Sequence, residues 1–269
     1  MGNRIRQLFT FPQVQHLHDR LKARYGLEDR ATKKAPMISF GCYPGSKKEI
    51  QMLLKQQDLV VVVWAGSDAM YMRMPKHREM MKAVKKASHF RHIAISQYIV
   101  KDLKALGIRH EFLPVSQVNE SMFSPEPMGD SIFFYDSVSS RKSVFYGSEI
   151  VKEIKAKMPG VKFVSGAQAG KTHVSYASMP DVYRKCFLGL RPTPHDGLPN
   201  TAVELGLMGR RCICNHELPN CLRYRDVKDI MEIIEREQGR IGQTDIETAE
   251  KMKRYISIPD DWLNEDHYG

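Results

Sequence analysis

The sequence predicts an α/β protein built on parallel sheets, and three observations support this class. Apolar segments of strand length alternate along the chain with segments of helical periodicity. Strands such as DLVVVVW (58–64) lack polar alternation, as is typical of strands covered on both faces. Residues 115–130 contain Pro125, Pro127 and Gly129 without periodicity, which indicates a linker between two such units.

The pattern predicts a first unit over residues 1–118, a linker over 119–130 and a second unit over 131–269. In the first unit, helices are expected at 14–25, 46–57, 76–87 and 97–106, and strands at 37–41, 58–64, 92–96 and 110–114. In the second, strands are expected at 131–135, 161–166, 187–192 and 212–215, and helices at 148–157, 180–186, 199–208, 225–237 and 244–255. Because open parallel sheets bind ligands at the carboxyl ends of their strands, two such units predict a cleft between them.

Composition excludes several classes of protein. A chain of 269 residues that is 42% hydrophobic has enough apolar side chains for a packed core and is not globally disordered. No run of about 18 apolar residues predicts a transmembrane helix, and the first residues lack the apolar segment of a secretory signal. Five cysteines, an odd number, predict reduced thiols and a cytoplasmic protein, in the host cytoplasm if the source is viral.

The positive charge is concentrated in the first half of the chain. Residues 1–120 contain 21 Lys and Arg against 10 Asp and Glu, a net charge of +11, whereas residues 121–269 have a net charge of −1. A one-sided basic surface attracts polyanions, and a solvated face kept for solubility is the alternative. The segment 73–91 is rich in cations, and its Lys82, Lys85 and Lys86 are candidate contacts to a polyanion.

The most informative segment is LRPTPHDGLPNTAVELGLMGRRCICN (190–215). A strand leads into a turn with Asp196 and Gly197, and a helix begins near Pro199. Free N–H groups at such a helix start bind phosphate, and Asp196 and Glu204 can face one ligand from two sides. This arrangement describes a nucleotide-sugar site, but an ordinary loop with a capped helix fits the spacing equally well.

DGLPNTAVELGLMGRRCIC (196–214) resembles the E-x7-E segment of family 4 glycosyltransferases, with Asp196 in place of the first Glu and Glu204 at the second. HIAISQYIVKDLKALGIRHEFLPVSQVNESMFSP (92–125) resembles the family's last N-domain strand, helix, strand and linker, and VKFVSG with HVSYASMPDVYRKC resembles the segments before the donor site. The resemblance covers about residues 90–215. It implies a GT-B fold, with two Rossmann-like domains whose parallel sheets face an interdomain cleft.

The resemblance implies a retaining, metal-independent glycosyltransferase with a nucleotide-sugar as co-substrate and no cofactor. Asp196 would then contact the transferred sugar and Glu204 the nucleotide ribose. The family's phosphate-binding Lys-Gly pair is replaced here by Tyr146-Gly147, so a neighbouring cation is expected to supply the charge. The expected donor-binding residues are Arg141, Lys142, Arg191, Gly197, Leu198, Pro199, Asn200, Thr201 and Glu204.

A second motif, VVVWAGSDAM (61–70), resembles the family's N-domain loop that faces the transferred sugar and the acceptor. Trp64, Gly66 and Ser67 are therefore candidate acceptor contacts. Asp68 is a candidate catalytic base or polar anchor for the acceptor hydroxyl, and an Asp that caps the next turn is the equal alternative. Because the basic half is the acceptor side of this fold, we expect a polyanionic acceptor. DNA with hydroxylated bases, as in phage DNA-modifying glycosyltransferases, comes first, and a glycan or lipid-linked acceptor at an anionic surface is the alternative.

Three other interpretations compete with the transferase. A non-enzymatic nucleic-acid-binding protein would use only the basic half and would not need the Asp196–Glu204 pair. SGAQAGKT (165–172) nearly spells a P-loop, but Ser165 replaces the first Gly and the following residues start a helix poorly. Cys212-x-Cys214-x-His216 could hold zinc, but small core residues explain both cysteines and no metal is expected. The absence of a D-x-D motif argues against a metal-dependent GT-A transferase.

Overall fold

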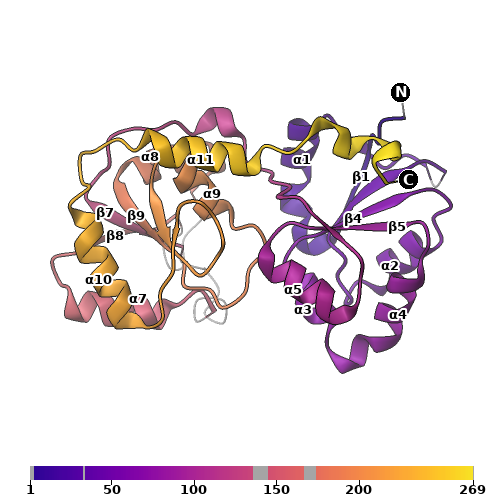
Figure 1. The fold of residues 1–269 in the computed structure, drawn as a ribbon, viewed down its shortest axis with the longest axis horizontal. Coiled ribbons are helices and arrows are strands. Elements are labelled where there is room, and N and C mark those ends of the chain that lie inside the picture. The colour runs from indigo at the N-terminus through magenta and orange to yellow at the C-terminus, as the bar shows by residue number, and fades with distance from the viewer. Residues whose placement is uncertain (1–2, 33, 136–144, 167–173, 269) are drawn as a thin grey trace. The chain divides into compact units, whose positions relative to one another are not determined.

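The computed structural model describes residues 3–32, 34–135, 145–166 and 174–268, which form two compact α/β units (Figure 1). Unit 1 comprises Met1–Val118, His195–Leu198 and Ile256–Gly269, and unit 2 comprises Asn119–Pro194 and Pro199–Tyr255. The first division falls after Val118, next to the expected linker. The sequence predicted that residues 131–269 all belong to the second unit. In the structure, His195–Leu198 and Ile256–Gly269 belong to unit 1 instead.

Unit 1 is built on a six-stranded sheet in which every pairing is parallel. In sheet order the strands are β2 (Glu28–Asp29), β1 (Gln7–Thr10), β3 (Met37–Phe40), β4 (Val60–Trp64), β5 (Phe90–Ala94) and β6 (Glu111–Phe112). All five residues of β4 are 0% exposed, which confirms that this strand is covered on both faces. β1 was not predicted, although it pairs with both β2 and β3.

The helices of unit 1 lie around this sheet (Figure 1). They are α1 (His18–Tyr25), α2 (Lys47–Leu54), α3 (Ser67–Met72), α4 (Arg78–Lys86) and α5 (Gln97–Leu106), with 3-10 turns at Pro12–Leu17 and Pro75–His77. α5 has the predicted bounds because both of its ends carry local signals. The Ser96 side chain accepts a hydrogen bond from the N–H of Ile99, and Gly107 ends the helix with a φ of 64°.

The C-terminal segment packs on unit 1, which explains the changed boundary. It contains the 3-10 turns Asp260–Leu263 and Glu265–Tyr268. The N–H of Ile5 donates to the Leu263 carbonyl at 2.6 Å, and the Trp262 and Tyr25 rings meet edge to face at 5.2 Å between centroids. These contacts join residues more than 200 positions apart, so no local pattern could have predicted them.

Unit 2 contains a five-stranded parallel sheet. In sheet order its strands are β11 (Cys221–Leu222), β10 (Arg211–Ile213), β9 (Cys186–Leu190), β7 (Ser131–Phe134) and β8 (Lys162–Val164). Its helices are α7 (Ser148–Lys157), α8 (Met179–Arg184), α9 (Asn200–Leu207), α10 (Val227–Gln238) and α11 (Ile246–Ile256), with 3-10 turns at Glu120–Met122 and Tyr176–Ser178. The linker packs onto this unit, because the buried Arg210 guanidinium donates to the carbonyls of Glu126 and Pro127 at 2.9 and 2.8 Å.

The cysteines depart from the expectation of reduced thiols. Cys214 and Cys221, whose Cα atoms are 5.6 Å apart in unit 2, form a disulfide in the structure, while Cys42, Cys186 and Cys212 are buried and free. An odd total excludes complete pairing but does not exclude one pair. Within the described ranges, no helix has both the length and the hydropathy needed to cross a bilayer.

Candidate functional site

Asp68 organises the loop that follows β4 in unit 1. Its carboxylate is 0% exposed and accepts four backbone hydrogen bonds. Oδ2 accepts from Cys42 and Ala65 at 2.9 and 3.1 Å, and Oδ1 accepts from Gly66 and Ala69 at 2.8 and 2.9 Å. Burial raises the pKa of Asp68, and the four N–H donors act in the opposite direction. This arrangement fits the alternative of an Asp that caps the next turn and fastens it to the end of β3.

The predicted acceptor contacts at the end of β4 differ in exposure. Trp64 lies in the core at 0% exposed, so it presents no surface to an acceptor, and its indole N–H donates to His92 Nδ1 at 3.2 Å. Gly66 is buried with a φ of 148°, a backbone conformation that favours glycine. Ser67 is half-buried at the start of α3 and hydrogen-bonds the buried Tyr43. Only Ser67 therefore offers part of its side chain to solvent.

The segment His195–Leu198 packs against the same loop of unit 1. A Cβ at Gly197 would lie 2.2 Å from the Ala65 carbonyl oxygen, so this close approach requires glycine. Gly197 donates its N–H to the Asp196 side chain at 2.9 Å, and Ser96 Oγ donates to the Asp196 carbonyl at 3.4 Å. Asp196 is therefore held beside the carboxyl ends of β4 and β5.

Hydrogen bonds to the buried Asp102 anchor this segment. His195 Nε2 donates to Asp102 Oδ2 at 2.8 Å, and Arg73 donates to Asp102 Oδ1 at 2.6 Å. Burial of Asp102 acts to raise its pKa, but the hydrogen bonds from His195 and Arg73 outweigh that effect and hold the pKa below its usual value. Asp102 and Arg73 were not singled out in the sequence, because Asp102 is 93 residues from His195 and 29 residues from Arg73.

In unit 2, the carboxyl ends of β7 and β9 form a topological switch point. The chain continues from β7 to β8 on one side of the sheet, and from β9 to β10 on the other. Ligands of open α/β sheets bind at such points. Arg191 directly follows β9 at 8% exposed, and its guanidinium carbon lies 5.2 Å from the ring centroids of both Tyr135 and Tyr146. The two rings are themselves in edge-to-face contact, 4.9 Å apart, so the predicted cation lies beside an aromatic pair.

Glu204 lies on α9, the helix that follows Arg191. It is 4% exposed, and its Oε2 accepts a hydrogen bond from the Tyr183 hydroxyl at 2.6 Å. Thr201, one turn earlier on the helix, is also buried, and its hydroxyl is 3.5 Å from the Arg191 guanidinium. Burial and the neighbouring Glu204 charge raise the pKa of Tyr183 well above its usual value, so the phenol remains a donor. The structure therefore brings Arg191, Thr201 and Glu204 into one cluster.

The predicted donor-binding residues fall into three groups. Pro199, Asn200, Thr201 and Glu204 belong to unit 2 with Arg191, whereas Asp196, Gly197 and Leu198 belong to unit 1. Arg141 and Lys142 lie outside the described residues, as does Lys171 of the P-loop-like segment. Tyr135 and Tyr183 had no sequence signal of their own, since aromatic residues near strand ends are common in cores.

The three predicted lysines of α4 lie on its exposed face. Lys82 Nζ contacts the Glu79 carboxylate at 2.8 Å, and Lys85 Nζ lies 3.4 Å from the Leu106 carbonyl at the end of α5. All three side chains are exposed to solvent, and Lys85 also lines a cavity of unit 1. Across the described ranges, no group of three or more His, Cys, Asp or Glu residues is arranged to hold a metal ion.

Several solved structures are similar to this chain. A sucrose-phosphate synthase from Thermosynechococcus elongatus matches with a TM-score of 0.62 at 12% identity, over 91% of this chain and 74% of that one. Anabaena HepE, in complex with UDP and glucose, matches with a TM-score of 0.58 at 13% identity, over 98% of both chains. TarM matches with a TM-score of 0.60 at 12% identity, and this chain spans 57% of its length.

No protein-family model matches the sequence, and a search of curated proteins finds no match. The structural neighbours are GT-B glycosyltransferases, and the present chain shares their fold of two Rossmann-like α/β domains with parallel sheets. This confirms the fold predicted from the sequence.

Proposed function

We propose that this protein is a glycosyltransferase that moves a sugar from a nucleoside-diphosphate sugar to an acceptor hydroxyl. One observation supports the proposal most strongly: Arg191, Thr201 and Glu204 cluster beside the switch point of unit 2. Ligands bind at this place in open α/β sheets. The UDP and glucose complex of HepE supports a nucleotide-sugar as the donor.

In this proposal Arg191 stabilises the diphosphate. A guanidinium is always charged and matches the geometry of phosphate oxygens. The rings of Tyr135 and Tyr146 fix its position, so little ordering is needed when charge develops on the leaving diphosphate. Glu204 accepts hydrogen bonds from the ribose hydroxyls, and the first N–H groups of α9 add to the phosphate contacts. We further propose that transfer retains the anomeric configuration and needs neither metal nor cofactor.

Unit 1 supplies the acceptor side of the proposed reaction. Asp196 contacts the transferred sugar, and its loop is held by the His195–Asp102 hydrogen bond. Ser67 is the partly exposed polar residue after β4 and is assigned to the acceptor. Asp68 acts as a positioning residue, because its carboxylate is occupied by four backbone N–H groups.

The acceptor we propose first is DNA with hydroxylated bases. The net charge of +11 over residues 1–120 supports a polyanion, since phosphate contacts could offset the few kcal/mol needed to flip a base out of a duplex. Incorporation of a labelled sugar into hydroxymethylated DNA, with none into plain DNA, tests this choice. Transfer to a glycan or a lipid-linked acceptor instead would replace the acceptor and leave the transferase proposal standing.

The donor site is tested by thermal shift across UDP-, GDP-, ADP- and CMP-sugars, with calorimetry for the ligand that binds. A ligand present at about 100 times its Kd stabilises the folded state by about 2.7 kcal/mol. The variant to compare is Glu204→Gln, which keeps an oxygen acceptor for the Tyr183 hydroxyl and removes the charge. We expect it to weaken binding of the nucleotide-sugar about tenfold or more, because it weakens charge-assisted bonds to the ribose.

Two controls separate binding from stability. Tyr183→Phe removes the partner of Glu204 but no ligand contact, so it should lower the melting temperature and leave the affinity nearly unchanged. Glu232→Gln, on the exposed side of α10, removes the same charge from the same unit without either effect. A Glu204→Gln protein that binds every nucleotide-sugar as the wild type does would overturn the donor site.

A further inference from the structure

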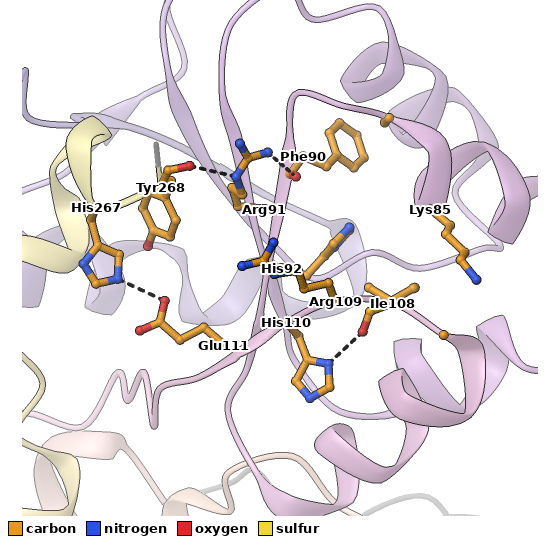
Figure 2. A pocket seen from close by; sticks show the side chains of 12 residues that line it. Lys85, Phe90, Arg91, His92, Ile108, Arg109, His110, Glu111, His267 and Tyr268 are labelled. Atoms are coloured by element: carbon orange, nitrogen blue, oxygen red, sulfur yellow. Dashed lines mark hydrogen bonds and ion pairs between the residues drawn. The ribbon is translucent and has the colours of Figure 1, made fainter.

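Unit 1 contains a cavity of about 640 Å³ at the amino end of β5. Its walls include Phe90, Arg91 and His92, the first three residues of that strand, and residues 107–111 before and at the start of β6 (Figure 2). His267 and Tyr268 of the C-terminal segment complete it. Asp68 and Ser96 follow the carboxyl ends of β4 and β5, so the cavity lies at the opposite edge of the sheet from the proposed reaction site.

The cavity is lined by an excess of positive charge. Lys85, Arg91 and Arg109 are permanent cations, and Glu111 is the one carboxylate among the lining residues. His267 Nε2 lies 3.0 Å from a carboxylate oxygen of Glu111, so this carboxylate already has a hydrogen-bond partner in the cavity wall. Within the described part of the chain, none of the three cations has a carboxylate within 4.0 Å. Their charge is therefore left for a ligand or for solvent.

Two of the lining groups are held in fixed positions. Arg91 Nε donates to the Tyr268 carbonyl at 2.9 Å, and Arg91 Nη1 donates to the Phe90 carbonyl at 3.1 Å (Figure 2). Nη1 also donates to the Ser88 carbonyl at 2.9 Å. Carbonyl partners orient the guanidinium without cancelling its charge. His92 is 9% exposed, and because its Nδ1 accepts from Trp64, the neutral ring has its proton on Nε2. A fixed cation and a buried imidazole donor thus face the same cavity.

We propose that this cavity binds a ligand through its phosphate groups. Arginine forks match phosphate oxygens bidentately, and a volume of about 640 Å³ is within the range of small-molecule sites. The phosphates belong either to a free small molecule or to a nucleic-acid backbone that reaches this edge of the sheet. The inference does not depend on the transferase proposal: Lys85 is the one predicted acceptor contact among the lining residues, and none of the predicted donor-binding residues lines the cavity.

Lys85 also has a structural role that the test must separate. Its Nζ lies near the last carbonyls of α5, where a cation is favoured by the helix dipole. Arg109 has no comparable structural role. Its side chain is exposed, and among the described residues it forms neither a hydrogen bond nor an ion pair. Arg109→Gln is therefore the informative variant, since it removes a cation from the cavity without removing a contact of the fold.

The experiment is calorimetric titration of the full chain with inorganic pyrophosphate. We expect wild-type protein to bind it and Arg109→Gln to bind about tenfold more weakly, the usual effect of losing one charge-assisted contact. Lys104→Ala is the matched control, because it removes one exposed charge from α5 of the same unit at a residue that does not line the cavity, and its affinity should equal that of the wild type. Arg191→Lys distinguishes this site from the proposed donor site, since it should leave the Arg109-dependent binding in place.

Repeating the titration with a short single-stranded oligonucleotide identifies the source of the phosphates. If the oligonucleotide displaces pyrophosphate and also loses affinity in Arg109→Gln, the ligand is a nucleic-acid backbone. If pyrophosphate binds and the oligonucleotide does not displace it, the ligand is a small molecule. The inference would be overturned if the wild type and Arg109→Gln bound pyrophosphate equally, or if the wild type did not bind it at all.

Discussion

The loop after β4 in unit 1 and the switch point of unit 2 hold their buried polar residues in different ways. In unit 1, Asp68 is bound by four backbone N–H groups and His92 by the indole of the core residue Trp64. In unit 2, Arg191 lies beside the paired rings of Tyr135 and Tyr146, and Glu204 accepts a hydrogen bond from the Tyr183 hydroxyl. The carboxylate after β4 is thus fixed by backbone donors, whereas Arg191 and Glu204, beside the switch point of unit 2, are positioned by neighbouring side chains.

This difference predicts whether a substitution changes mainly the stability of the protein or mainly its affinity for a ligand. A carboxylate whose acceptor sites are occupied by backbone donors cannot exchange them for a ligand without breaking the loop, so its removal costs stability. The Arg191 guanidinium keeps its full positive charge beside two tyrosine rings, because aromatic faces attract a cation without neutralising it. We therefore expect changes at Asp68 and His92 to alter folding, and changes at Arg191 to alter binding.

The largest expected effect is at Asp68. Asp68→Ala would leave four buried N–H groups without an acceptor, at about 1–3 kcal/mol for each unsatisfied group. We expect the free energy of unfolding to fall by about 4 kcal/mol or more, measured by urea denaturation. Asp58→Ala, at the turn before β4, is the control and should change stability by about 0.5 kcal/mol or less. An Asp68→Ala protein as stable as wild type would remove the contrast between the units.

The next effect concerns Arg191. Arg191→Lys keeps the charge but loses the planar fork and the stacking on Tyr135 and Tyr146. We expect affinity for the nucleoside diphosphate to fall about tenfold, or about 1.4 kcal/mol, with a smaller change in stability. Arg184→Lys, an exposed ion-pair residue of the same unit, should leave affinity unchanged. If Arg191→Lys instead destabilises the protein and binds the nucleotide normally, the cluster is a structural one.

Local signals predicted much of the fold. The bounds of α5 and of α7 agree with the prediction because side-chain caps, glycine and apolar periodicity act over a few residues. β1 was missed because QLFT is only four residues long and is followed at once by a helical pattern. Residues 256–269 pack on unit 1 through contacts with Ile5 and Tyr25. The sequence around residues 256–269 gives no sign of these distant partners.

The candidate site shows the same limit. Arg191, Thr201 and Glu204 lie within 14 positions and share one strand–turn–helix motif, so the sequence could predict them together. Tyr183 and Asp102 were missed because each becomes a partner only when distant segments pack. For Asp68 the sequence left a catalytic base or acceptor anchor and a turn cap equally open, because the motif shows a polar residue after a strand but not the four N–H groups that surround it.

The smallest expected effect is at His92 and depends on pH. Burial, together with the nearby His110 and Arg91, lowers the pKa of His92 from 6.5 to about 4. The unfolded state therefore binds more protons than the folded state between these values, and stability falls as the pH is lowered through that window. From pH 7 to about 5.5 the loss of unfolding free energy amounts to about 1 kcal/mol.

His92→Phe should lower stability at neutral pH, because it removes the acceptor of the Trp64 indole, but it should flatten the dependence of stability on pH over this range. His16→Gln, at an exposed histidine, should keep the wild-type slope. Denaturation midpoints across this pH range decide the matter: a His92→Phe protein with the full wild-type slope would mean that another group carries the titration.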